Sequence, residues 1–180
     1  GLIGRAEMIS EHHLGKTIVN YVKNQDINLN QYQLEAGEAI KGKGVTATIE
    51  GHKLILGNRA LLQDGGMIIP DEIEDYAVQR ERAGNTAIFV TVNDEIAAIV
   101  SIADQIRDEA KQALAKLREQ GIERIIMLTG DNRHTAEAVA NELGLDEFHA
   151  ELLPEDKVTH VKRLKAQGAI IGMTGDGVND

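Results

Sequence analysis

The chain has 180 residues, no cysteine and a formal net charge of −10 at pH 7. These values exclude a disulfide framework and a thiolate metal site, and they disfavour a general nucleic-acid or membrane-surface binder, which needs a basic face. No apolar run approaches the roughly 20 residues that a membrane-spanning helix needs.

The first hundred residues predict helices and an antiparallel sheet. Apolar residues recur at helical spacing between Ile9 and Val22, which predicts one helix over about 6–23. Two pairs of β-rich runs meet at short turn signals, and strands joined in this way form antiparallel sheets. The first predicted hairpin covers 44–58 and turns at Glu50–Gly51. A helix follows over 70–83, beginning at Pro70. The second predicted hairpin covers 86–102 and turns at Asn93–Asp94.

After Ile102 the pattern changes to alternating helices and short apolar strands. This alternation is typical of a parallel, doubly wound α/β sheet, so we place a domain boundary near Asp104. The predicted elements are a helix over 107–120, a strand over 124–128, a helix over 133–143, a short segment near Phe148, a helix over 155–166 and a strand over 169–173.

The predicted strand 124–128 runs directly into Thr129, Gly130 and Asp131. Ligands of parallel α/β sheets bind beyond the carboxyl ends of the strands. This loop opens onto a helix, whose first N–H groups can bind a phosphate-like anion. The simpler alternative is that Asp131 or Asn132 only caps the helix.

A second loop follows the predicted strand 169–173 and repeats the threonine, glycine and aspartate. Its Asp176, Asn179 and Asp180 supply the hard oxygen ligands that Mg²⁺ prefers, although a solvated polar turn would look the same. Lys157 lies in the first turn of a predicted helix, where the helix dipole disfavours a cation by about 0.3–1 kcal/mol. It could neutralise a phosphoryl group at this rim, or it could be one of many surface lysines.

The first half offers a candidate pocket. Glu11 and His12 lie near a helix start, Gly42-Lys43-Gly44 precedes a hairpin, and Gly57-Asn58 closes it. Glycines allow close approach of a flat group, while the histidine and glutamate offer hydrogen bonds. Ordinary turn glycines and a solvated histidine are the alternative. With three Tyr, two Phe and no Trp, an aromatic sandwich around a base is not expected.

The ordered motifs SEHHLGK, GKGV, GN, DQIR, MLTGDN, LLPEDK and TGDGVND resemble P-type ATPases, and more narrowly their heavy-metal-transporting branch. The resemblance covers essentially the whole chain. It implies an ATP-binding domain over 1–102, followed over 103–180 by part of a haloacid-dehalogenase-like, Rossmann-type phosphorylation domain. It also implies a pump for ions such as Zn, Cd, Co or Cu, driven by ATP and Mg²⁺ through an aspartyl phosphate. Its other parts would be actuator and membrane domains, with this part on the cytoplasmic side of a cell membrane.

Carried over position by position, the resemblance implies a role for each motif residue. The nucleotide-binding positions are Glu7, His12, Gly42, Gly44, Gly57 and Asn58, with Glu11 beside them. The positions near the transferred phosphate are Thr129, Asp131 and Lys157, with Gly130 in the same loop. The Mg²⁺ positions are Asp176 and Asp180, with Asn179 between them, and the interdomain hinge is Asp104 and Arg107.

The chain departs from the family pattern in two ways. His13 stands where the family has proline, which frees the backbone and adds an N–H group. The family's Asp-Lys-Thr-Gly-Thr, whose aspartate is phosphorylated, is absent from these 180 residues. We therefore expect a pump fragment that binds ATP without turnover. Its residues 104–180 should be packed more loosely than residues 1–102 or should associate with another chain.

The sequence also bears on three alternative functions. A haloacid-dehalogenase-like phosphatase would need an Asp-x-Asp loop after an early strand, and none is present. A non-catalytic adenine-nucleotide-binding module stays open, because such a fragment would behave in the same way. Metal binding by His12 and His13 is disfavoured, on the argument that adjacent histidines on a helix point apart. The motifs do not identify the transported metal, although their wording is somewhat closer to zinc, cadmium and cobalt pumps than to copper pumps.

Overall fold

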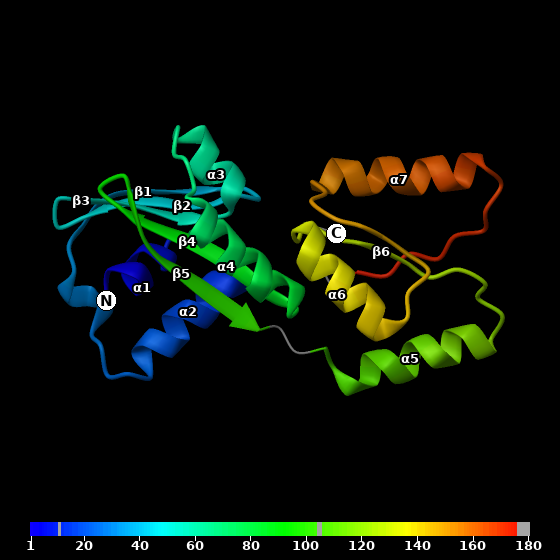
Figure 1. The fold of residues 1–180 in the computed structure, drawn as a ribbon. Coiled ribbons are helices and arrows are strands. Elements are labelled where there is room, and N and C mark those ends of the chain that lie inside the picture. The colour runs from blue at the N-terminus through cyan, green and yellow to red at the C-terminus, as the bar shows by residue number, and fades with distance from the viewer. Residues whose placement is uncertain (11, 104–105, 176–180) are drawn as a thin grey trace. The chain divides into compact units, whose positions relative to one another are not determined.

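The structure is a computed structural model that describes residues 1–10, 12–103 and 106–175. The chain divides into two compact units (Figure 1). The first, here called the sheet unit, comprises Gly1–Arg80 and Ala87–Ile102, and the second unit comprises Glu81–Thr86 and Ala103–Asp180. Within the described ranges, no helix is both long and apolar enough to cross a membrane.

The sheet unit is built on five strands in the order β1-β2-β3-β4-β5. Both predicted hairpins are confirmed, since Glu50 and Gly51 at one turn and Asn93 and Asp94 at the other all have positive φ. Such turns match the twist of antiparallel strands. The strands are β1 (Leu34–Ile40), β2 (Gly44–Ile49), β3 (His52–Gly57), β4 (Asn85–Val92) and β5 (Glu95–Ala103).

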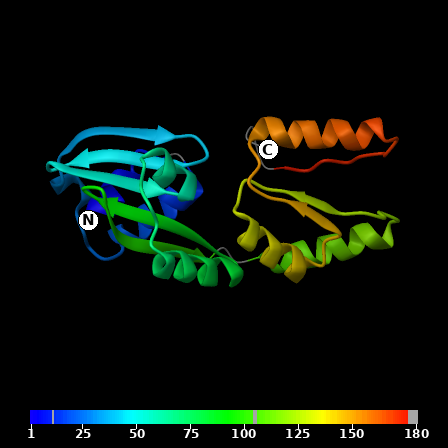
Figure 2. The ribbon, with the colours of Figure 1, turned by 45° about the horizontal axis from the view of Figure 1, so that its top comes forward.

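Helices cover both faces of this sheet (Figures 1 and 2). Because side chains alternate along a strand, Leu54 and Leu56 of β3 face one pair of helices and Ile55 faces the other. One face packs on α1 (Leu2–Glu7) and α2 (His13–Lys23), and the other on α3 (Arg59–Asp64) and α4 (Asp71–Arg82). The sheet unit therefore has two hydrophobic layers, one on each face.

The prediction of one helix over 6–23 is wrong, because the chain forms α1 and α2 with a break between them. Side chains in the break take over backbone donors: Ser10 Oγ accepts from the His12 N–H at 3.2 Å, and His12 Nδ1 accepts from the Leu14 N–H at 3.4 Å. Local bonds of this kind compete with the helical ladder and start a new helix instead.

The sequence also failed to predict β1, α3 and a 3-10 turn, η1 (Leu29–Gln31). β1 is an edge strand whose five central residues are all exposed, so it shows no apolar alternation. β1 is a strand because its backbone pairs with that of β2. α3 has six residues, too few for helical periodicity to be visible.

The second unit alternates helices and short strands as predicted. β6 (Ile126–Leu128) and β7 (Glu147–His149) are parallel neighbours, which confirms the expected sheet type. Arg118 links a helix to the start of β7 by donating to the Gly144 carbonyl at 2.7 Å and to the Asp146 carboxylate at 3.1 Å. The helices of this unit are α5 (Asp108–Glu119), α6 (Arg133–Leu143) and α7 (Pro154–Ala166).

The predicted strand over 169–173 is wrong, because the described residues after α7 form neither helix nor strand. Ile170 is fully exposed, and no described strand lies beside it to accept its backbone hydrogen bonds. An apolar run without such a neighbour leaves its N–H and C=O groups to water.

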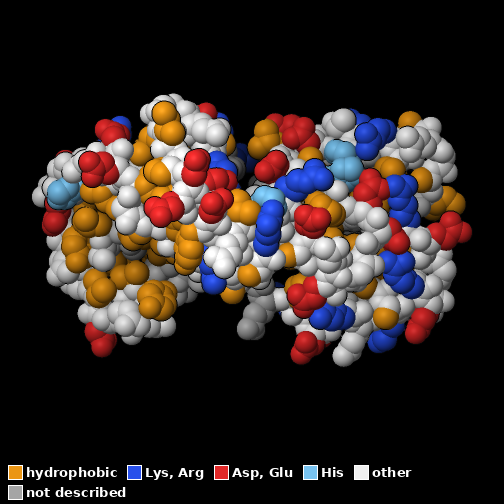
Figure 3. All heavy atoms as spheres, in the orientation of Figure 1, with side chains coloured by type: hydrophobic (Ala, Val, Ile, Leu, Met, Phe, Trp, Pro, Cys, Tyr) orange, Lys and Arg blue, Asp and Glu red, His pale blue; other side chains and the backbone are white. Residues whose placement is uncertain are grey.

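The second unit has a sparse core. Among its described residues the buried hydrophobic ones are Ala136 and Ala140, whereas large side chains such as Leu54, Leu62 and Phe89 are fully buried in the sheet unit. Figure 3 shows hydrophobic side chains of the second unit at the surface among charged ones. This contrast agrees with the expected difference in packing. The exposed large hydrophobic residues of this unit are Leu117, Ile122, Leu153, Val158, Ile170 and Met173.

Candidate nucleotide and phosphate site

Two of the predicted glycines face each other across neighbouring strands. Gly44 of β2 pairs with Gly57 of β3. A Cβ atom on Gly44 would overlap the Leu56 carbonyl oxygen and lie 2.5 Å from the Gly57 Cα, and one on Gly57 would overlap the Lys43 carbonyl oxygen. Both positions therefore require glycine, and they leave a stretch of bare backbone at this end of the sheet.

Asn58 ties this backbone to a helix. Its Oδ1 accepts from the Leu61 N–H at 3.1 Å as the N-cap of α3, and its Nδ2 donates to the Gly42 carbonyl at 2.9 Å. Its own N–H donates to the Lys43 carbonyl at 2.9 Å. The fold thus brings Gly42 of the β1–β2 turn and Gly44 at the start of β2 together with Gly57 at the end of β3 and Asn58 before α3.

Glu7 is a buried acid at the end of α1. Its side chain is 5% exposed, and its Oε2 lies only 2.6 Å from the place a Cβ on Gly15 would occupy. The carboxylate is therefore packed against the first turn of α2. Burial disfavours the charged form and raises the pKa of Glu7 to about 7. A carboxyl that titrates near neutral pH is a recognised feature of functional sites.

His12 is the N-cap of α2, and His13 is its first helical residue. Their rings lie side by side with centroids 4.4 Å apart. The argument that these histidines point apart is wrong, because His12 precedes the helix. His13 occupies the position where proline is favoured, so it can replace the family proline without breaking the helix. Among the described residues, no three potential ligands are grouped around a metal site.

In the second unit, Thr129 follows β6 and closes a tight polar loop. Its hydroxyl donates to Asp131 Oδ2 at 2.7 Å and accepts from the Asp131 N–H at 3.1 Å. Asn132, not Asp131, caps α6, because its Oδ1 accepts from the Thr135 N–H at 3.0 Å. The Asp131 carboxylate is thus not needed to cap the helix, and this loop opens onto α6 as predicted.

The Thr129 loop is held by the segment that follows β7. The Thr129 N–H donates to the His149 carbonyl at 2.9 Å, and the Leu152 N–H donates to the Thr129 carbonyl at 3.0 Å. Glu151 completes the attachment, its N–H donating to the Asp131 carbonyl at 2.8 Å. A pocket of about 400 Å³ adjoins this segment and is lined by Arg133 and residues 146–152.

Lys157 lies in the first turn of α7 and is half-buried. Asp156 Oδ2 accepts from the Leu153 N–H at 3.0 Å, so an acid lies at the helix start in the same turn as the cation. Arg107 is the N-cap residue of α5. Five of the predicted site residues lie outside the described ranges: Glu11, Asp104, Asp176, Asn179 and Asp180.

The structure also shows polar residues that the sequence did not single out. Arg59, directly after Asn58, bonds to Glu74 through Nε at 2.7 Å and lies 5.2 Å above the centre of the Phe89 ring. His149 accompanies Glu147 at the end of β7. Two signals in the sequence could have identified them: Arg59 directly follows the motif residue Asn58, and His149 lies at the end of a strand. A separate pocket of about 690 Å³, near the start of α4, includes none of the predicted residues.

The sequence and the fold match known proteins. A family model described as haloacid dehalogenase-like hydrolase matches residues 2–180, so the chain belongs to that family. Within the family, the resemblance to heavy-metal-transporting P-type ATPases is confirmed by similarity to curated proteins and to solved structures. A copper-exporting P-type ATPase of Staphylococcus aureus (strain JH9) is 41% identical over 179 residues, which are 99% of this chain and 22% of that protein.

Two solved structures extend the comparison. A zinc-transporting PIB-type ATPase in the E2.Pi state is 33% identical with a TM-score of 0.60, covering 99% of this chain and 28% of that one. The catalytic domain of the CPx-ATPase CopB-B, studied for conformational changes on nucleotide binding, is 27% identical with a TM-score of 0.69, covering 99% and 61%. Both copper and zinc occur among these names, so they do not decide the metal.

Proposed function

We propose that this chain is the ATP-binding part of a heavy-metal-translocating P-type ATPase, together with part of its phosphorylation domain. The observation that carries the proposal is the bare backbone around Gly44 and Gly57, fastened by Asn58 in a chain of this family. The chain spans 22% of the length of a curated relative. Metal transport, the actuator and membrane domains, and a place on the cytoplasmic side of a membrane are therefore proposed for the whole pump.

In this proposal the sheet unit binds the nucleoside. A flat base could approach the backbone around Gly42 and Gly44, because these residues carry no side chain of their own. His12 and Glu7 would supply polar contacts from the adjoining helices, with Glu11 beside them. Glu7 is the group whose proton can be gained or lost near neutral pH, given its raised pKa.

The second unit would receive the phosphates. The Thr129 hydroxyl and the N–H groups at the start of α6 offer donors to an anion, and Lys157 offers a positive charge. Asp176 and Asp180, with Asn179, carry the oxygen ligands for Mg²⁺, which when bound would neutralise phosphate charge. Asp104 and Arg107 are the proposed hinge. Without Asp-Lys-Thr-Gly-Thr, these 180 residues are expected to bind ATP but not to form an acyl phosphate.

The test is a residue-resolved NMR titration of the 180-residue chain with ATP, with and without Mg²⁺. Saturable amide shifts are expected at Glu7, His12, Gly42–Gly44 and Asn58, and no labelled γ-phosphate should be incorporated. Shifts confined to Thr129 and Lys157, or none at all, would refute the nucleotide pocket.

Asn58 offers a variant that separates binding from folding. Asn58→Ser keeps a side-chain cap for α3 but removes the Nδ2 donor to the Gly42 carbonyl, whereas Asn58→Ala removes both. We expect Asn58→Ser to weaken ATP binding about fivefold, since losing one hydrogen bond of a preorganised turn costs about 1 kcal/mol. Asn28→Ser, at the cap of η1, is the matched control and should bind ATP normally. Equal affinities for Asn58→Ser and the control would contradict the assigned role.

A further inference from the structure

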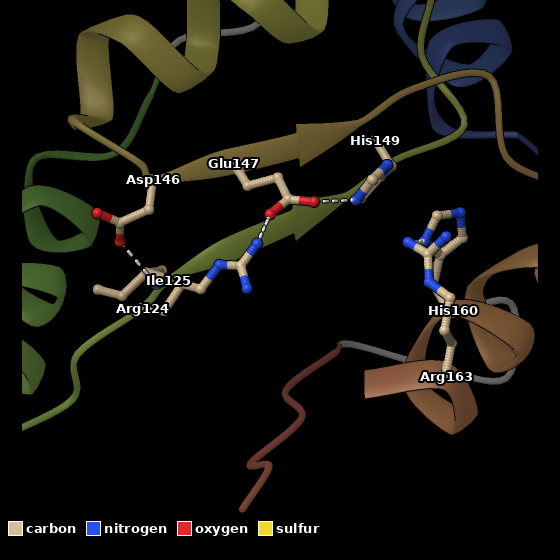
Figure 4. Close-up of polar contacts among 7 residues, drawn as sticks. All are labelled: Arg124, Ile125, Asp146, Glu147, His149, His160 and Arg163. Carbon is tan, nitrogen blue, oxygen red and sulfur yellow. Dashed lines mark hydrogen bonds and ion pairs between the residues drawn. The ribbon is translucent and has the colours of Figure 1, made fainter. Parts of the chain in front are cut away.

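A chain of charged and imidazole groups connects β7 with α7 in the second unit (Figure 4). Glu147 is paired with Arg124 on one side, and its Oε1 lies 2.7 Å from His149 Nε2 on the other. The His149 ring lies against the His160 ring of α7, with centroids 4.1 Å apart and planes at 41°. His160 Nδ1 is in turn 3.3 Å from the Arg163 guanidinium.

The contact matters because α7 is loosely packed. The helix contains no fully buried residue. Its half-buried positions follow helical spacing and include Lys157, His160, Val161 and Leu164. Lys157 and His160 therefore share the inward face of α7, one turn apart. Few apolar side chains hold this face, so one imidazole pair is a large part of its attachment.

We propose that the His149–His160 pair is a proton-sensitive latch that holds α7 against β7 and releases it when His160 is protonated. A charged His160 would face the His149 ring of β7 and the Arg163 guanidinium of its own helix. Arg124, before β6, adds positive charge behind Glu147. The negative groups nearby are Glu147, already engaged by Arg124 and His149, and Asp156, engaged at the Leu153 N–H.

The balance of these groups opposes the charged form. Burial lowers the pKa of His160 below its ordinary value, and the charges of His149 and Arg163 lower it further against the opposing pull of Asp156 and Glu147. A histidine with a lowered pKa in the folded state stabilises that state above its ordinary pKa of about 6.5. The stabilisation is lost as the pH falls below that value, which sets the direction of the latch.

Release would reach the candidate phosphate site, and this consequence rests on the proposed function. Lys157 lies one turn before His160, and the His149 carbonyl accepts the Thr129 N–H. The latch therefore links the helix that carries Lys157 to the strand that holds the Thr129 loop, where the proposed phosphate would bind. Acidification would lower the phosphate affinity of the second unit, because Lys157 and the Thr129 loop could then separate.

The test is hydrogen exchange of the 180-residue chain without nucleotide, combined with NMR titration of the imidazoles between about pH 8 and about pH 5.5. Amides over residues 155–163 are expected to lose protection, corrected for intrinsic rates, with the midpoint at which His160 titrates. A midpoint of α7 opening that differs from that of His160 would overturn the latch. Because ATP is absent, failure here is distinct from failure of the nucleotide proposal.

Phenylalanine variants test whether protonation of the imidazole, and not the packing of the rings, controls the release of α7. His160→Phe and His149→Phe each keep an aromatic ring at the contact but remove the imidazole nitrogens. The protection of α7 should then vary less with pH in His149→Phe and not at all in His160→Phe. His52→Gln, on the exposed start of β3, is the control and should keep the wild-type response. The same acid-induced loss in the wild type and both phenylalanine variants would overturn the proposal.

Discussion

Replacing Glu7 by glutamine should raise the free energy of unfolding of the sheet unit by roughly 3 kcal/mol at pH 8. The reason is the burial of this carboxyl, which raises its pKa from 4.5 to about 7. Glutamine has nearly the same shape and carries no charge to bury. The gain should be small at about pH 4.5, where the native carboxyl is itself protonated.

The sign follows from linkage between protonation and folding. A carboxyl whose pKa is raised in the folded state stabilises that state fully below its ordinary pKa. That contribution is lost as the pH rises through about 7, and above that value the group adds no further pH dependence. The wild-type sheet unit should therefore lose stability between about pH 5 and about pH 8, and Glu7→Gln should be nearly insensitive over that range.

Urea unfolding followed by the methyl resonances of Leu54 and Leu56 would measure this, because both lie in the core of the sheet unit. Glu38→Gln is the matched control, since Glu38 is exposed on β1. Parallel pH profiles for the wild type and Glu7→Gln would show that the carboxyl is not buried in its charged form. A response in Glu38→Gln as large as that in Glu7→Gln would also contradict the prediction.

Gly44→Ala should destabilise the sheet unit by more than about 3 kcal/mol and abolish ATP binding. The added Cβ would overlap the Leu56 carbonyl oxygen and approach the Gly57 Cα to 2.5 Å, so two paired strands would have to separate. Gly44 also has φ 143, a conformation that alanine rarely adopts. Backbone atoms of a paired strand cannot move aside without breaking hydrogen bonds, whereas the end of a flexible side chain can change its rotamer.

Gly51→Ala distinguishes the effect of steric overlap from the effect of backbone strain at positive φ. Gly51 has φ 75 at the β2–β3 turn, but a Cβ there meets no atom within 4 Å. It should cost only about 1 kcal/mol of backbone strain and leave ATP binding intact. Unfolding in urea and calorimetric ATP binding measure both variants. Similar costs for the two alanines would mean that strain, not the close approach of β2 and β3, makes glycine necessary at position 44.

The local signals in the sequence determined much of the organisation. Turn residues at Glu50–Gly51 and Asn93–Asp94 predicted both hairpins, and Pro70 and Gly84 bracketed α4, because such signals act within a few residues. The alternation after Ile102 predicted a parallel sheet, which β6 and β7 form. The ordered motifs pointed to the family before any geometry was available, because several weak matches in the right order are jointly specific.

Features that depend on distant partners were decided only by the tertiary structure. Residues 169–173 look like a strand but have no described neighbour to pair with, while β1 lacks apolar alternation and is a strand because β2 pairs with it. The sequence marked Gly44 and Gly57 as candidates, and the fold brought their backbones into contact. Likewise, Glu7 acquired its raised pKa from burial, and His149 its contact with His160 from the packing of one element on the next, and the pattern within a single element encodes neither.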